Sequence, residues 1–148
     1  MSALPVYRTP VREDWIDYNG HLSEAYYVLV FGFATDQVMD RIGLDAASRE
    51  AAGSSLYTVE AHVRYLQEVA RGAELAVTTT IAGSAARKLH LAHEMTVDDE
   101  LVATEEILCL HVAGEPARAA PFPDAVAARI TEHGAASAPD WIGRAIRI

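Results

Sequence analysis

The sequence predicts an α+β fold in which one long buried helix is wrapped by a five-stranded antiparallel sheet. An apolar stretch without proline runs from residue 23 to residue 42 and predicts the helix. Four segments of alternating or continuous apolar character follow it and predict strands. The length of 148 residues is typical of one domain with a single core.

The predicted helix starts near Ser23 and ends before Gly43, because a glycine after an apolar stretch is typical of a helix C-terminus. Its first half is apolar on every side, as in helices that are buried or that cross a membrane. The charged residues Glu24, Asp36 and Arg41 disfavour a membrane span. We therefore expect a central helix that is surrounded by protein.

The strands are predicted from side-chain alternation. Residues 57–65, 75–81 and 89–97 alternate between two kinds of side chain, and a period of two predicts strands with one buried face. Residues 101–112 are apolar on both faces, which predicts a strand in the interior of the sheet. The acidic turn Asp98-Asp99-Glu100 joins the last two strands as a hairpin. Short connections favour antiparallel neighbours.

Two further segments complete the predicted domain organisation. A short strand interrupted by Pro10 precedes the helix, over residues 6–12. The last part of the chain contains four prolines and an alanine-rich stretch, with a short helix predicted at residues 124–133. We divide the chain into a domain over residues 1–115 and a C-terminal extension over residues 116–148, which packs on the domain or on a partner.

Composition and charge narrow the classes of partner. A net charge of −9 disfavours nucleic acid, whose phosphates need a basic surface. An anionic ligand would need a local basic cluster that works against this overall charge. The first residues show no basic start followed by an apolar stretch, so we expect a cytoplasmic protein without a membrane anchor. The single cysteine, Cys109, lies in an apolar run and is interpreted as a small buried hydrophobic residue.

Four motifs carry a resemblance to a known family. They are Trp15-Ile16-Asp17-Tyr18-Asn19-Gly20-His21, Tyr57-Thr58-Val59-Glu60, Arg64-Tyr65-Leu66 and His90-Leu91-Ala92-His93-Glu94-Met95. The first motif, with Tyr26-Tyr27 after it, resembles the Asp-x-x-Gly-His signature of thioesterases of the 4-hydroxybenzoyl-CoA type, which have the hotdog fold. The match covers roughly residues 4 to 113. The set of motifs is also similar to betainyl-CoA thioesterases of carnitine catabolism and to thioesterase domains fused to carnitine dehydrogenases.

The resemblance implies an acyl-CoA thioesterase, with betainyl-CoA as a candidate substrate and no cofactor, since CoA is part of the substrate. Asp17 precedes the helix on a turn that Gly20 allows to bend sharply. A carboxylate there can attack the thioester directly or deprotonate a water molecule, and the sequence leaves both routes open. The free N–H groups of the first helical turn form a suitable oxyanion hole.

By the same resemblance, the catalytic groups are Asp17, His21 and the backbone amide of Glu24. The expected substrate-binding residues are Trp15, Tyr18, Asn19, Tyr26, Tyr27 and Glu60. The aromatic residues near Asp17 would attract a trimethylammonium acyl group through cation–π contacts. The alternatives are a turn or helix-cap role for Asp17, local packing for His21, core packing for the tyrosines and a solvated strand position for Glu60.

The basic pair Arg87-Lys88 lies at the turn between residues 75–81 and residues 89–97. It resembles the basic cluster that holds the CoA phosphates in the 4-hydroxybenzoyl-CoA enzymes, and the alternative is an ordinary charged turn. His90 and His93 point to opposite faces of their strand, so we expect no metal site.

Two other functions remain open at this stage. A hotdog dehydratase or hydratase usually pairs a histidine with a carboxylate on the helix, whereas Asp17 precedes the helix. A non-catalytic acyl-CoA binding protein would need Arg87 and Lys88 but not Asp17. Hotdog dimers join two sheets edge to edge and build each site from both chains, so we expect a homodimer or homotetramer.

Overall fold

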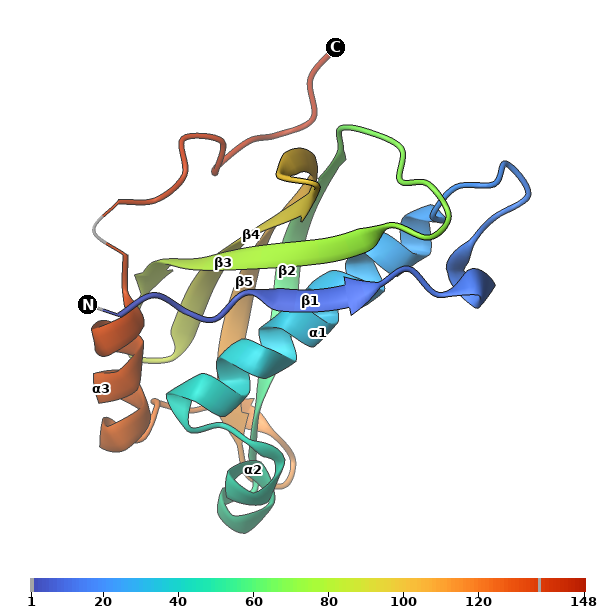
Figure 1. Cartoon of the computed structure of the whole chain (residues 1–148). Helices are drawn as coiled ribbons and strands as arrows, with labels where there is room; N and C mark the ends of the chain where they lie inside the picture. The colour runs from blue at the N-terminus through green and yellow to red at the C-terminus, as the bar shows by residue number, and fades with distance from the viewer. Residues whose placement is uncertain (1, 136) are drawn as a thin grey trace.

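The computed structural model describes residues 2–135 and 137–148 and shows a curved antiparallel sheet with a long helix across one face (Figure 1). In chain order the elements are β1 (Tyr7–Pro10), a 3-10 turn (Glu13–Trp15), α1 (Glu24–Ile42), α2 (Ala46–Ala52), β2 (Ser54–Tyr65), β3 (Glu74–Ser84), β4 (Lys88–Val97), β5 (Glu100–Ala113), β6 (Arg118–Ala119) and α3 (Asp124–His133). The predicted α+β architecture is confirmed. The short helix α2 and the two-residue strand β6 were not predicted.

The strand order is β1-β3-β4-β5-β2, and β6 pairs with β5 off this path. Strands β3, β4 and β5 are antiparallel neighbours, as predicted. Strands β2 and β3 are consecutive in the chain but are not neighbours, because residues 66–73 carry the chain from one side of the sheet to the other. The expectation that consecutive strands pair is therefore wrong at this connection, and β2 becomes an edge strand.

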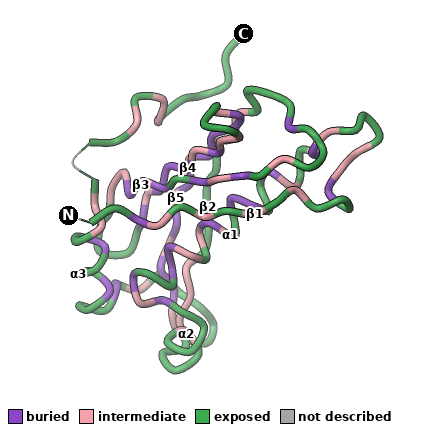
Figure 2. Tube along the Cα trace, viewed as in Figure 1, coloured by how far each residue is buried: buried purple, intermediate pink, exposed green. Residues whose placement is uncertain are grey.

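Helix α1 buries a single stripe of side chains against the inner face of the sheet. The stripe consists of Tyr27, Val30, Phe31, Ala34, Val38, Met39 and Ile42. The expectation that the first half of the helix is covered on all sides is wrong, since Val28 and Leu29 are 42% and 40% exposed. The buried and exposed segments of the helix can be followed in Figure 2. Within the two described ranges, the helices are too short or too polar to cross a membrane.

A β-bulge at Val59 divides β2 into two halves. Thr58 pairs with Cys109 and Glu60 pairs with Leu108, so one residue of β2 has no partner on β5. Because of the extra residue, the side chains on the two sides of the bulge alternate in opposite phase between the two faces of the sheet. Before the bulge, Thr58 therefore lies against the buried thiol of Cys109, and Tyr57 is 50% exposed. The predicted single buried face over residues 57–65 is therefore wrong before the bulge, and after it Ala61 and Tyr65 are exposed while Val63 is only partly buried. Cys109 itself is buried in the core, as predicted.

The hairpin between β4 and β5 has the predicted position. Val97 pairs with Glu100, and Asp98 and Asp99 form the turn with φ values of 50° and 65°. Two consecutive residues in the left-handed region are typical of the tight hairpin turn that matches strand twist. Aspartate tolerates this region better than most residues, which explains the acidic turn.

The segment after β5 packs back on the sheet. Helix α3, which occupies the predicted residues 124–133, contributes Val126 and Ile130 to the core. Further on, the indole N–H of Trp141 donates to a carboxylate oxygen of Glu94 at 3.3 Å. The backbone N–H of Gly143 donates to Glu106 at 2.7 Å.

Two ionisable residues face each other on the inner strands of the sheet. His93 of β4 pairs with Glu105 of β5, and they are 0% and 4% exposed. The His93 ring contacts the hydroxyls of Thr79 at 2.7 Å and Thr35 at 2.9 Å. Burial lowers the pKa of His93 to about 3 and raises the pKa of Glu105 to about 7. Both side chains are therefore held towards their neutral forms.

These two pKa shifts predict a stability profile that is flat in the wild type between about pH 4.5 and pH 6.5. The His93 contribution is present above its unfolded pKa of 6.5 and is lost as the pH falls. The Glu105 contribution is present below its unfolded pKa of 4.5 and is lost as the pH rises through about 7. Between about pH 4.5 and pH 6.5, the unfolded chain carries one proton on His93 and the folded chain carries one proton on Glu105. The contributions of the two residues to the pH dependence of stability therefore cancel.

Single substitutions allow the contributions of His93 and Glu105 to the pH dependence of the free energy of unfolding to be measured separately. Glu105→Gln should make the free energy of unfolding fall with decreasing pH in this window, by up to about 1.4 kcal/mol per pH unit. His93→Gln should give a slope of the opposite sign. Urea unfolding at several pH values measures both slopes, and two parallel flat profiles would contradict the assignment of the shifts.

Candidate active site

A cleft of about 640 Å³ lies at the N-terminal end of α1 and brings together five of the residues expected at the site. These are Asp17, Asn19, His21, Glu24 and Tyr27. The other lining residues are Leu22, Tyr65, Leu66, Gln67 and Glu68. The cleft is thus formed by the loop before α1, the first turn of α1 and the chain that leaves β2.

One carboxylate oxygen of Asp17 stabilises the turn before α1, and the other is open for chemistry. Its Oδ1 accepts the backbone N–H of Asn19 at 2.9 Å and that of His21 at 3.4 Å. Gly20, with a φ of 81°, lets the chain return so that the backbone of His21 also bonds Asp17 at 2.9 Å. No hydrogen bond from the described residues engages Oδ2. The turn therefore holds the carboxylate in place while one oxygen stays available for chemistry.

The first turn of α1 offers unpaired backbone donors beside Asp17. The N-cap residue Ser23 makes no side-chain capping bond, and its carbonyl accepts the N–H of Tyr26 at 3.0 Å. The amides of Glu24 and Ala25 have no backbone acceptor in the part of the chain that the structure describes. These donors lie at the positive end of the helix dipole, which is the arrangement that stabilises a developing oxyanion.

A pair of tyrosines forms one wall of the cleft. The rings of Tyr27 and Tyr65 meet edge to face with centroids 5.1 Å apart. The Tyr27 hydroxyl donates to the carbonyl of Gln67 at 3.1 Å, and the Tyr65 hydroxyl donates to the carbonyl of Glu24 at 3.3 Å. Burial and nearby acids raise the pKa of both phenols. Tyr65 was not among the expected site residues, although it ends an alternating strand inside one of the recognised motifs.

The charges around the cleft are predominantly negative. Its lining includes the carboxylates of Asp17, Glu24 and Glu68, and neither lysine nor arginine is among the lining residues. The imidazole Nε2 of His21 lies 3.3 Å from the Glu68 carboxylate. Glu68 is a further residue that the sequence did not single out. This lining favours a positively charged group over a negatively charged one.

Three expected aromatic residues lie outside the cleft lining. Trp15 is 5% exposed and stacks on Tyr26 with ring centroids 5.8 Å apart, because the 3-10 turn directs the indole into the core. Tyr18 is 97% exposed at the tip of the loop. A cage of these three rings around a ligand is therefore not formed in this chain, and the aromatic faces near Asp17 come from Tyr27 and Tyr65.

The expected CoA-binding pair lies at the opposite end of the sheet. Arg87 and Lys88 are exposed at the turn between β3 and β4, whereas the Asp17 loop lies near the start of β3. Figure 1 shows the two segments at opposite sides of the molecule. The 11 residues of β3 separate them by roughly 35 Å. One chain therefore does not bring the pair to its own Asp17.

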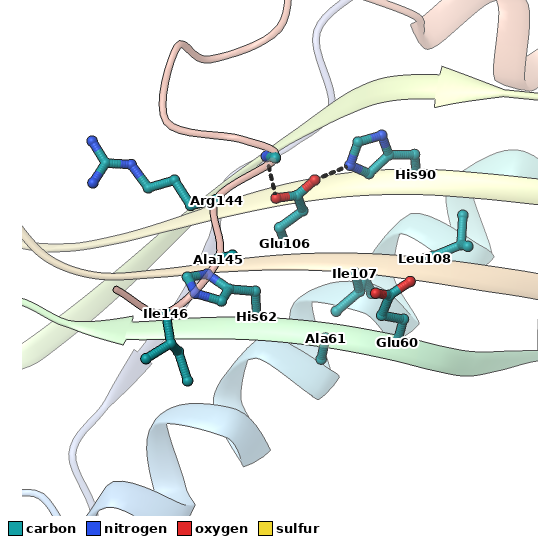
Figure 3. Close-up of a pocket in the computed structure, with 11 residues that line it drawn as sticks. Glu60, Ala61, His62, His90, Glu106, Ile107, Leu108, Arg144, Ala145 and Ile146 are labelled. Carbon is teal, nitrogen blue, oxygen red and sulfur yellow. Dashed lines mark hydrogen bonds and ion pairs between the residues drawn. The ribbon is translucent and has the colours of Figure 1, made fainter. Parts of the chain in front are cut away.

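Glu60 lines a different cleft, on the outer face of the sheet. This cleft of about 540 Å³ lies between the strands and residues 143–146 (Figure 3). Glu106 links its two walls, since one oxygen is 2.6 Å from the His90 Nε2 and the other accepts the Gly143 N–H. The expected substrate-binding role of Glu60 is therefore not supported by its position, because the Asp17 cleft lies elsewhere.

The two histidines considered for metal binding lie apart. His90 bonds Glu106 on the outer face, while His93 is buried between Thr35 and Thr79 on the inner face. The prediction that they point to opposite faces is confirmed. The described residues contain no group of three or more histidine, cysteine or acidic side chains placed to hold a metal ion.

Comparisons with known proteins give a consistent relationship. Residues 11–130 match the family model of the thioesterase-like superfamily. The chain is 42% identical to a betainyl-CoA thioesterase from Pseudomonas aeruginosa, over 98% of this chain and 95% of that protein. It is 44% identical to an L-carnitine dehydrogenase/betainyl-CoA thioesterase from Ruegeria pomeroyi over 90% of this chain, which corresponds to 28% of that longer protein.

The fold is similar to that of a Staphylococcus aureus protein whose structure was solved in complex with CoA. The TM-score is 0.92 at 26% sequence identity, with 99% of this chain and 96% of the other covered.

Proposed function

We propose betainyl-CoA as the substrate of this chain, which belongs to the thioesterase-like superfamily and is an acyl-CoA thioesterase with the hotdog fold. Hydrolysis would release glycine betaine and CoA. The observation that carries the proposal is the cleft at Asp17, which combines an acidic lining with two tyrosine rings. The likeness to betainyl-CoA thioesterases over nearly the whole chain supports the same substrate.

The acidic cleft complements the acyl group of this substrate. A betainyl group carries a trimethylammonium cation beside the thioester. Carboxylates attract this cation, and the faces of Tyr27 and Tyr65 supply cation–π contacts. An acyl group with a free carboxylate would instead meet Asp17, Glu24 and Glu68 and be repelled.

Asp17 is the proposed catalytic carboxylate, and both of its routes remain open. As a nucleophile, it forms a bond to the thioester carbon and expels CoA thiolate, and water then cleaves the mixed anhydride. As a base, it takes a proton from a water that attacks the same carbon. In both routes the free amides at the start of α1 stabilise the oxyanion, the acid is released, and the CoA sulfur is protonated. The reaction consumes one water and needs no further cofactor.

The two alternative functions have less support from the geometry. A hydratase would need a histidine facing a helical carboxylate, but the cleft histidine His21 has its Nε2 3.3 Å from the carboxylate of Glu68, which is not on a helix. A protein that only binds acyl-CoA would not need the open Oδ2 of Asp17 beside free helix amides. Thioester hydrolysis uses both features.

A homodimer joined through β2 is the proposed assembly. Strand β2 pairs with β5 on one side, and Tyr57, Val59 and Tyr65 are exposed along it. Antiparallel pairing of two β2 strands would place the Ser54 end of one chain beside the Tyr65 end of the other. The partner's Arg87 and Lys88 would then lie at the Asp17 end of this chain, roughly 15 Å across the sheet.

The first prediction concerns Asp17→Asn. An asparagine oxygen can still accept the N–H groups of Asn19 and His21, so the turn and the fold should be retained. The carboxylate needed by either route is lost, and kcat should fall by roughly 100-fold or more. Thiol release from betainyl-CoA measures the rate. Asp14→Asn is the matched control, because this exposed acid belongs to the same segment and bonds only Arg12, and equal rates in all three proteins would refute the role of Asp17.

A second prediction compares two acyl groups of nearly the same shape. Betainyl-CoA and 3,3-dimethylbutanoyl-CoA differ by a cationic nitrogen in place of a neutral carbon. The acidic cleft should favour the cation by roughly tenfold or more in kcat/KM. The preference should shrink with added salt if it is electrostatic. Equal kcat/KM values for the two substrates would remove the proposed substrate while leaving thioesterase activity intact.

Mixed dimers test whether each site uses both chains. Asp17→Asn chains and Arg87→Ala/Lys88→Ala chains should each be inactive or weak alone. In a hybrid dimer, the intact Asp17 of one chain meets the partner's intact Arg87 and Lys88. Co-refolding equal amounts should restore about a quarter of the wild-type activity, because half of the dimers carry one complete site. Activity no higher than the average of the parents would mean that each chain works alone.

A further inference from the structure

Glu105 is a buried acid that the proposed mechanism does not use. It lies on β5 between Ala103 and Ile107, two core residues on the same face of the strand, so its side chain also faces the inside. It is 4% exposed, and no hydrogen bond from the described residues reaches its carboxyl group. Carboxyl groups of buried residues are normally hydrogen-bonded or paired, whereas the Glu105 carboxyl has no such partner among the described residues and its oxygens are not fully enclosed.

The neighbours of Glu105 do not neutralise it. Its cross-strand partner on β2 is Val63, which is apolar. Its partner on β4 is His93, whose two ring nitrogens are engaged by Thr35 and Thr79. Burial lowers the pKa of His93 to about 3, so this ring stays neutral and provides no counter-charge.

Glu105 lies behind the tyrosine wall of the Asp17 cleft. Tyr65 is paired with Ala103, two residues before Glu105, and both side chains lie on the inner face of the sheet. The register places Glu105 two residues along the sheet from Tyr65, and burial together with the negative charges of Glu24 and Glu105 raises the pKa of the Tyr65 phenol. Tyr65 lines the cleft that contains the proposed catalytic carboxylate, and Glu105 lies next to the Tyr65–Ala103 pair without lining the cleft itself.

We propose that Glu105 is the specificity-determining counter-ion for the cationic acyl group of the substrate, with Tyr65 and Tyr27 supplying the aromatic faces. This assignment rests on the proposed function and deepens it. A trimethylammonium group has no N–H to donate, so charge and aromatic contact are the means by which a protein recognises it. One methylene separates its nitrogen from the thioester carbon, so the counter-ion must lie close to the site of hydrolysis.

The experiment replaces Glu105 with glutamine, which keeps the shape and removes the charge, and it is run at about pH 8, where a carboxyl with a pKa of about 7 is mostly ionised. KM for betainyl-CoA should rise roughly tenfold or more. KM and kcat for 3,3-dimethylbutanoyl-CoA should stay within about twofold of the wild type, because this acyl group has no charge to pair. Glu105→Asp, which retains the charge on a shorter side chain, should keep the preference for the cation.

Glu106→Gln is the matched control. This neighbour lies on the same strand but points to the outer face, where it bonds His90 and Gly143, so its loss should leave both KM values unchanged. Equal losses on both substrates in Glu105→Gln would show a structural role and overturn the proposal, as would an unchanged preference. A wild type without any preference for betainyl-CoA would refute the substrate itself. The two failures are therefore distinguishable.

Discussion

The burial of one stripe of α1 against the inner face of the sheet is the constraint on which the rest of the structure depends. Phe31 and Val30 are fully buried at the centre of this contact, and Ile42 is fully buried near its end. Each such side chain contributes roughly 1.5–3 kcal/mol when removed from water. Because the stripe has to face the strands, the direction of the helix axis and the position of its first turn are determined by the packing. The free amides of that turn are therefore held by the core rather than by a flexible loop.

The start of α1 is also tied to the connection between β2 and β3. The N–H of Leu22 donates to the carbonyl of Val69 at 2.9 Å, and the hydroxyl of Tyr27 donates to the carbonyl of Gln67. The crossover of residues 66–73 thus has two effects. It separates β2 from β3 in the sheet, and it supplies the wall opposite Asp17. The unpaired edge of β2 and the acidic cleft are both consequences of this one connection.

The periodic elements were predictable because local patterns determine them. The limits of α1 and the turn at Asp98 and Asp99 follow from residue types that act over a few positions. The bulge at Val59 was not predictable, because it depends on the pairing of β2 with a strand some 50 residues later. The exposed side of α1 also looked buried, since an apolar sequence does not by itself distinguish a helix face in the core from one on the surface.

The structure brings together in one cleft those expected residues that are close in sequence. The loop from Asp17 to Glu24 is one short segment, so its turn and its relation to the helix could be derived from residue types alone. Tyr65 and Glu68 reach the same cleft through the strand order, which no local pattern reveals. Trp15 and Tyr26 stack on each other outside the cleft lining, because aromatic side chains next to a helix start pack into the core as readily as they line a cleft.

The contacts of His93 have a consequence for the orientation of the helix. The hydroxyl of Thr35 donates its only proton to the carbonyl of Phe31, so it can only accept from the ring nitrogen Nε2. The neutral ring must then carry its proton on Nε2, and Nδ1 accepts the proton of Thr79. This directed chain of hydrogen bonds runs from β3 through β4 to α1 and breaks if the helix rotates about its own axis. The single tautomer of His93 thus fixes the rotation of α1 about its axis. That rotation determines the direction in which the amides beside Asp17 point.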